Sequence, residues 1–151
     1  MTFQKKIDTA LAANNLSDAL GVILEHFGAD AGTIHLLEAD GVLHLKAASA
    51  GIPAQVLDAV RLVPVGKGLA GMAVERKEPV TVCNLQSDSG SGARPGAKAT
   101  GMEGAIVVPI LAGEQAIGAL GIGNRVERTF TEEETSHLMR LGRAIAERQR
   151  S

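Results

Sequence analysis

The 151-residue chain has the length of one domain, and its composition, 45% hydrophobic and 21% charged, is typical of a globular protein. Its 15 Lys and Arg and 17 Asp and Glu give a formal net charge of −2, which offers no long-range attraction for nucleic acid or an anionic membrane. The first residues lack the apolar core of a secretory signal, and no apolar run approaches the ~20 residues of a membrane span. We therefore expect one cytoplasmic domain, residues 1–151, without a nucleic-acid or membrane partner.

Two amphipathic helices are predicted at the start of the chain. Apolar side chains recur at helical spacing over residues 3–11 and again over residues 17–27. Ser17 is expected to cap the second helix with its hydroxyl, and Gly28 is expected to end it in the left-handed conformation.

A β-hairpin is predicted next, because alternating apolar residues flank the turn-forming pair Asp40-Gly41. If these two residues are the whole turn, Leu37 faces His44, and His35 and His44 share the polar face of the hairpin. Two imidazoles without Asp, Glu or Cys at ligand spacing are a weak metal signal. We therefore assign both histidines a structural role and expect no metal site.

The middle of the chain contains short elements and one long polar segment. Short helices are predicted over residues 54–60 and 68–76, and a brief strand over residues 80–83. The Gly-, Ser- and Pro-rich segment 84–101 is longer than an ordinary connection. Such a segment is typical either of a lid over a binding site or of a disordered loop.

Two strands and a helix complete the chain. Residues 104–111 are almost continuously apolar, as in a central strand that is buried on both faces. The next strand places small residues on one face, which leaves space beside the sheet for a ligand or a close-packed helix. These are Ala119, Gly121 and Gly123. A capping box of Thr131 and Glu134 predicts the start of the last helix, which should extend to about residue 147.

Five segments carry a family resemblance through their order and spacing. They are Val65-Gly66-Lys67-Gly68-Leu69-Ala70-Gly71, Pro79-Val80-Thr81-Val82-Cys83-Asn84, Ile106-Val107-Val108-Pro109-Ile110, Ile117-Gly118-Ala119-Leu120 and Phe130-Thr131-Glu132-Glu133. Over nearly its whole length the chain resembles a stand-alone GAF domain. The resemblance implies an α+β fold with a central antiparallel sheet, the N- and C-terminal helices on one face, and short helices plus the lid loop on the other. It also implies a ligand pocket between the sheet and the short helices.

Two apolar stripes on the terminal helices favour a homodimer. They are Phe3, Ile7 and Leu11, within the N-terminal helix of residues 1–14, and Leu138, Leu141 and Ile145. Because both helices should share one face of the sheet with a third helix, we expect part of these stripes to face outward and to pair with a second copy. The alternative is a monomer in which the first helix folds back and covers the other apolar side chains.

One branch of the family, the free methionine-(R)-sulfoxide reductases, consists of stand-alone GAF enzymes. Reduction of a sulfoxide by thiols needs a nucleophilic cysteine and a resolving cysteine. The resemblance implies one of these cysteines at the position of Ala70 and another in the lid loop, where this chain has none. The lone Cys83 matches neither position, so we expect no enzymatic activity.

A second branch binds cyclic nucleotides and carries the motif Asn-Lys…Phe-x-x-x-Asp-Glu, whose lysine and aspartate pair to brace the pocket. This chain matches it only in part, with Arg125 for the lysine and Glu134 for the aspartate. These two residues are expected to form a charged pair if the motif operates. The capping box already explains Glu134 without it.

The lid segment offers the groups that an anion needs. Arg94 can act as a bidentate fork, Lys98 as a point charge and Thr100 as a hydroxyl donor. The alternative is a solvated loop without a ligand.

The predicted ligand site combines the lid with the adjoining strands. Its residues are Cys83, Asn84, Asp88, Arg94, Lys98, Thr100, Val108 and Gly121. The leading hypothesis is a non-catalytic module of bacterial-type signal transduction that senses a small molecule, for which an anion is one candidate, and that holds no cofactor. The alternative is a GAF fold used mainly for dimerisation or partner docking.

Overall fold

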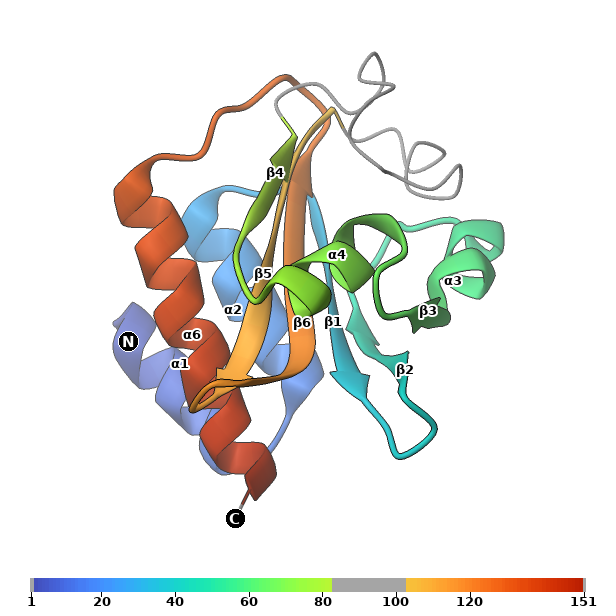
Figure 1. The fold of residues 1–151 in the computed structure, drawn as a ribbon. Coiled ribbons are helices and arrows are strands. Elements are labelled where there is room, and N and C mark those ends of the chain that lie inside the picture. Colours follow the sequence, from blue (N-terminus) through green and yellow to red (C-terminus); the bar gives the residue numbers. More distant parts are fainter. Residues whose placement is uncertain (1, 83–102, 151) are drawn as a thin grey trace.

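A six-stranded sheet forms the centre of the computed structural model, which describes residues 2–82 and 103–150 (Figure 1). Its strands are β1 (Ala31–Leu37), β2 (Val42–Ala48), β3 (Leu62–Pro64), β4 (Val80–Val82), β5 (Gly104–Ala112) and β6 (Gln115–Asn124). They lie in the order β3-β2-β1-β6-β5-β4, and every pair in this sheet is antiparallel. The α+β fold predicted from the sequence is confirmed.

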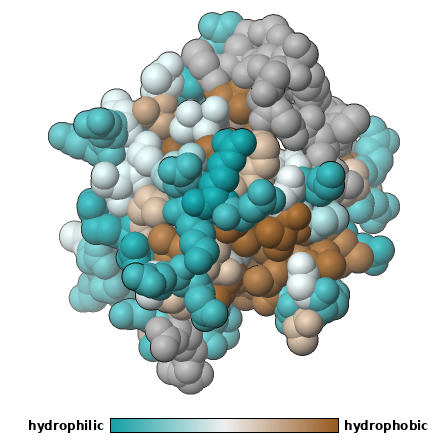
Figure 2. All heavy atoms as spheres, in the orientation of Figure 1, coloured by the Kyte–Doolittle hydropathy of each residue, from teal (hydrophilic) through white to brown (hydrophobic). Residues whose placement is uncertain are grey.

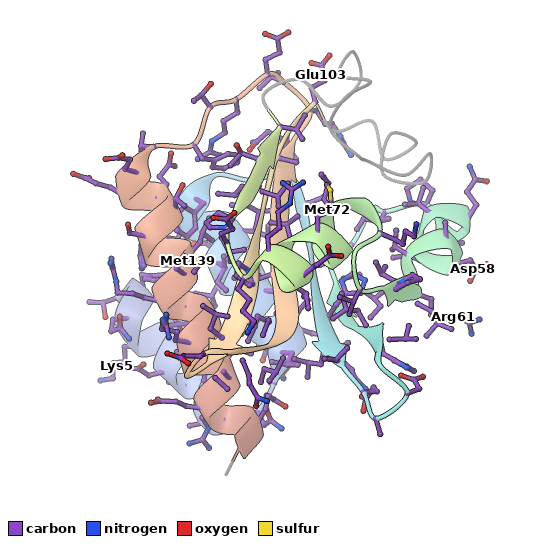
Figure 3. All side chains as sticks on the ribbon, viewed as in Figure 1. Lys5, Asp58, Arg61, Met72, Glu103 and Met139 are labelled. Atoms are coloured by element: carbon purple, nitrogen blue, oxygen red, sulfur yellow. The ribbon has the colours of Figure 1, made fainter. Side chains whose placement is uncertain are left out.

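Helices cover both faces of the sheet. The helices α1 (Phe3–Ala12), α2 (Leu16–Phe27) and α6 (Glu132–Arg150) lie on one face, and the shorter α3 (Ala54–Val60) and α4 (Gly68–Arg76) lie on the other (Figure 1). In Figure 3, Lys5 of α1 and Met139 of α6 mark the first side, and Met72 of α4 and Asp58 of α3 mark the second. No helix of residues 2–82 and 103–150 is long and apolar enough to cross a membrane.

Alternation along the central strands divides the core into two clusters. In β5, Ile106 and Val108 pack with the terminal helices, whereas Ala105 and Val107 belong to a second cluster with α4. The nearly continuous apolar run of this strand is therefore explained by burial on both faces, as predicted.

Local signals place most helix ends correctly. Gly28 ends α2 with a φ of +63°, and the capping box of α6 forms, with the backbone N–H of Glu134 3.1 Å from the Thr131 hydroxyl. The predicted Ser17 cap is wrong, because Asn15 caps α2 and accepts the N–H of Asp18 at 3.0 Å. The structure also adds β3, which the sequence did not predict, and extends α6 to Arg150.

The register of the β1–β2 hairpin differs from the prediction by one residue. Leu36, not Leu37, pairs with His44, because the turn contains three residues, with the N–H of Glu38 donating to the carbonyl of Val42 at 3.1 Å. Gly41 adopts a φ of +78° in this longer turn. The two histidines therefore lie on opposite faces of the sheet: His35 is buried, and His44 pairs with Asp40 at 2.8 Å.

The two apolar stripes of the terminal helices are covered within the chain. Ile7, Leu11, Leu138, Leu141 and Ile145 are all at most 6% exposed. Phe3 is the one stripe residue that is only half-buried, so little of the stripes faces outward, since α1 packs against both α2 and α6. Dimerisation itself stays a prediction, without this support.

Exposed apolar side chains occur instead near the other end of the sheet. Figure 2 shows apolar surface over β1 and β2, next to the edge strand β3. Leu62 and Val65, in β3 and directly after it, are among the exposed large aliphatic residues.

Candidate functional site

A cavity of about 160 Å³ lies between the sheet and the two short helices. Its floor consists of strand residues with small or short side chains, its roof is formed by the 50–52 segment, α3 and the first turn of α4, and Val63 of the edge strand β3 also lines it. The floor residues include Ala31, Thr33, Ala105, Val107, Gly121 and Gly123, and the roof residues include Ile52, Val56, Val60, Leu69 and Ala70.

The floor is open because glycine and alanine occupy positions where larger side chains would fill the space. Val107, Gly121 and Thr33 form one row across β5, β6 and β1. A Cβ atom on Gly121 would lie 3.2 Å from a methyl of Val107 and 3.6 Å from the hydroxyl of Thr33. Any larger side chain at this position must therefore extend over its neighbours and into the cavity.

His35 stands beside this row and joins the sheet to the roof. Its Nε2 lies 2.8 Å from the carbonyl oxygen of Val60, the last residue of α3. A carbonyl only accepts, so Nε2 carries the proton and Nδ1 carries a lone pair. Nδ1 is buried and has no hydrogen bond within the described part of the chain. Burial lowers the pKa of His35, so the ring stays neutral near pH 7.

Opposite charges stand at the mouth of the cavity. Asp30, just before β1, and Arg125, just after β6, both line the cavity and are exposed. One carboxylate oxygen of Asp30 accepts the backbone N–H of Arg125 at 2.7 Å, and the N–H of Asp30 donates to the carbonyl of Gly123 at 2.9 Å. These backbone bonds hold the two residues next to each other. The site thus combines an apolar interior with a charged entrance.

A family model described as "GAF domain" matches residues 14–147. The chain belongs to the GAF domain family. A comparison with curated proteins found no match.

Solved structures with the same fold include GAF domains of larger proteins and a free methionine-R-sulfoxide reductase. The GAF domain from a phosphoenolpyruvate-protein phosphotransferase of Coxiella burnetii superimposes with a TM-score of 0.81 at 22% identity, covering 98% of this chain and 90% of that one. The corresponding domain from Acinetobacter gives 0.77 at 18% identity, covering 96% and 90%. The free methionine-R-sulfoxide reductase of Neisseria meningitidis, in complex with its substrate, gives 0.76 at 19% identity, covering 97% and 87%. At these identities the likeness shows the fold alone.

The structure describes two of the predicted ligand residues of this GAF domain. Gly121 lies on the cavity floor, whereas the side chain of Val108 packs among the terminal helices on the opposite face. Strand alternation places its neighbour Val107 at the cavity instead. The remaining six predicted residues, Cys83, Asn84, Asp88, Arg94, Lys98 and Thr100, lie outside the described residues.

Several cavity residues of the GAF domain were not predicted. Thr33 and His35 share the face of β1 opposite Ile34, as predicted, but only the pairing of Thr33 with Gly121 of β6 shows that this face borders the cavity. Asp30 and Arg125 flank the strand ends, and no local pattern distinguishes them from other surface charges.

The charged pair predicted between Arg125 and Glu134 does not form. Glu134 is instead 2.5 Å from the guanidinium of Arg128, which also donates to the side-chain oxygen of Asn124 at 2.8 Å. The pKa of Glu134 is lowered chiefly by the backbone N–H of Thr131 and further by Arg128. This network connects the end of β6 to the first turn of α6 and leaves the Arg125 side chain at the cavity mouth.

Proposed function

We propose that this GAF domain is a non-catalytic sensor module that binds a small molecule in the cavity between the sheet and α3 and α4. The observation that supports it most is the row of small residues on the cavity floor, with Gly121 at its centre. A domain that used this fold only for packing or docking would gain stability by filling such a space with larger side chains. The alternative of a docking module therefore has less support.

The size of the cavity limits the ligand. A cavity of about 160 Å³ is close to the ~150 Å³ apolar cavity that holds one benzene molecule. Sites for drug-sized ligands occupy roughly 300–1,000 Å³. A cyclic nucleotide belongs to the larger class, so the cavity favours a compact molecule over a nucleotide.

The experiment is a titration with 3-methylbutan-1-ol, a neutral probe of suitable size, followed by ¹H–¹⁵N correlation spectra. We expect saturable shifts for the backbone amides of the cavity residues, because the alcohol removes apolar surface from water there. Gly121→Val should abolish these shifts by filling the floor. Thr81→Val is the matched control, since Thr81 is an exposed strand residue outside the cavity. Shifts that persist in Gly121→Val, or no saturable shifts in the unmodified protein, would contradict the proposal.

The non-catalytic part of the proposal rests on the cysteines. Ala70, at the position where the resemblance implies a reductase cysteine, lines the cavity with a methyl group that cannot attack a sulfoxide. We expect no thiol-dependent reduction of free methionine sulfoxide by the purified protein. Turnover that disappears in Cys83→Ser would refute this expectation.

A further inference from the structure

The charges at the cavity mouth suggest which chemical class of small molecule the site accepts. Asp30 and Arg125 are adjacent through the 2.7 Å bond from the Arg125 backbone to one Asp30 carboxylate oxygen. That bond uses the backbone N–H of Arg125 and leaves its guanidinium available. Within the described residues, neither the guanidinium nor the second carboxylate oxygen of Asp30 makes a hydrogen bond or an ion pair.

The negative charge of Asp30 and the positive charge of Arg125 cancel, and this determines which charged head group of a ligand fits at the mouth. A ligand with a single negative charge would pair with Arg125 but would lie beside the carboxylate of Asp30. A ligand with a single positive charge would pair with Asp30 but would lie beside the guanidinium of Arg125. A head group that carries both signs satisfies both residues, and charge complementarity of this kind selects ligands more than it raises affinity.

The interior requires the rest of the ligand to be apolar and short. Residues deeper than the mouth contribute aliphatic side chains and glycines, together with the Thr33 hydroxyl and the neutral ring of His35. The cavity volume of about 160 Å³ accommodates a group of roughly four to six carbon atoms, as judged from the benzene-sized cavity above.

We infer that the cavity binds a free α-amino acid with a branched aliphatic side chain, with its carboxylate at Arg125, its ammonium group at Asp30 and its side chain over Gly121. This inference rests on the proposed function, since it assigns a ligand class to the same cavity. The mouth recognises both ends of the free amino acid, so the same residue within a peptide, which lacks one or both charges, does not fit.

Four probes with the same branched body but different heads test the inference. They are L-leucine, 4-methylpentanoic acid, 3-methylbutan-1-amine and 3-methylbutan-1-ol, each titrated by isothermal calorimetry or by chemical shifts at pH 7. We expect L-leucine to bind at least about tenfold more tightly than either singly charged probe. The neutral alcohol reports on the cavity alone.

Variants at the mouth should redistribute these affinities in opposite directions. Arg125→Gln should lower the affinity for L-leucine and for the acid but not for the amine. Asp30→Asn, which keeps an acceptor for the Arg125 N–H, should lower the affinity for L-leucine and for the amine but not for the acid. Arg76→Gln, an exposed arginine outside the cavity, is the matched control.

The outcomes separate the two proposals. If the alcohol binds, Gly121→Val abolishes its binding, and L-leucine is no tighter than the singly charged probes, the amino-acid inference fails and the sensor proposal stands. The inference also fails if L-leucine is preferred but neither mouth variant changes that preference. If none of the four probes binds at millimolar concentration, both proposals fail.

Discussion

The two faces of the central sheet use the same strands but carry side chains of very different size. Toward the terminal helices, β5 and β6 present Ile106, Val108, Ile110, Leu120 and Ile122, all at most 3% exposed. Toward α3 and α4, the same strands present Ala105, Val107, Ala119, Gly121 and Gly123. The first face is filled by its own helices, whereas the second retains a cavity of about 160 Å³.

This difference places residues that stabilise the fold on one face of the sheet and the residues of the proposed binding cavity on the other. Large side chains on the helix face bury apolar surface and stabilise the fold. Small side chains on the cavity face leave apolar surface that a ligand can cover. Substitutions on the two faces should therefore have different consequences.

The largest expected effect comes from the centre of the helix layer. Leu138 is 1% exposed and packs in the cluster formed by α1, α2 and α6. Leu138→Ala should lower the free energy of unfolding by about 2–5 kcal/mol, because it removes buried methyl groups and leaves a void. Urea denaturation followed by circular dichroism measures the change. A loss below about 1 kcal/mol would show that the helix layer is loosely packed.

The burial of Leu138 also changes how dimerisation must be tested. A charged residue at this position would unfold the chain and would not report on an interface. Sedimentation equilibrium of the unmodified protein is the direct test, and a mass near the 15.6 kDa of one chain would contradict the predicted homodimer.

A matched pair in β5 compares the two faces directly. Val108 is fully buried against the helices, and Val107 borders the cavity. Val108→Ala should cost about 2–3 kcal/mol, and Val107→Ala only about 1 kcal/mol, since Val107 already has fewer neighbours to lose. The Val107 variant should also bind larger alcohols than the unmodified protein. Equal losses of stability in the two variants would contradict the distinction between the faces.

Arg128 and Arg125 allow a comparison between an arginine that is bonded within the fold and one that lies at the mouth of the cavity. Arg128 donates to Asn124 at 2.8 Å and to Glu134 at 2.5 Å, and lies 4.4 Å from the ring centroid of Phe130. Arg128→Gln should lower the free energy of unfolding by about 1–2 kcal/mol. This value is in the lower part of the range for charged hydrogen bonds, because the Arg128 side chain is 21% exposed to water. Arg125→Gln should change it by less than about 0.5 kcal/mol. The same denaturation curves test both, and a larger loss for Arg125 would place that residue in the fold instead of at the cavity mouth.

Local sequence signals predicted the elements better than the contacts between them. The short helix α4 and the strand β6 were predicted from their glycines and from the spacing of their small residues, and the structure contains both elements. The hairpin register depended on a single residue of turn length, and an error there placed His44 on the same face as His35. The partner of Glu134 was also mispredicted, because Arg125 and Arg128 are equally flexible, and only the packing of Asn124 and Phe130 selects Arg128. The cavity charges have no local signal at all.

The smallest expected effect is a dependence of stability on pH that arises in the helix layer. The ring of His137 lies 5.2 Å from that of His26 and 5.4 Å from that of Phe3, so it joins α6 to α2 and α1. Burial lowers the pKa of His137, and the neighbouring His26 and Arg140 lower it further. The unfolded chain therefore takes up this proton at a higher pH than the folded chain. The contribution of His137 to the free energy of unfolding is fully present above the ordinary histidine pKa of about 6.5. It decreases as the pH falls below that value.

Two histidine variants isolate this contribution. His137→Phe keeps an aromatic ring but removes the titration, so it should lose less stability than the unmodified protein between pH 7.5 and pH 5.5. His35, whose pKa is also lowered by burial, contributes a loss of the same sign in both proteins, so the variant should reduce the pH dependence without removing it. His44→Gln is the control, because His44 lies outside the helix layer and pairs with Asp40. We expect the effect to be small, since the His137 ring is only partly buried and water screens its interaction with Arg140. If His137→Phe and the unmodified protein show the same pH dependence, the histidine cluster makes no contribution to it.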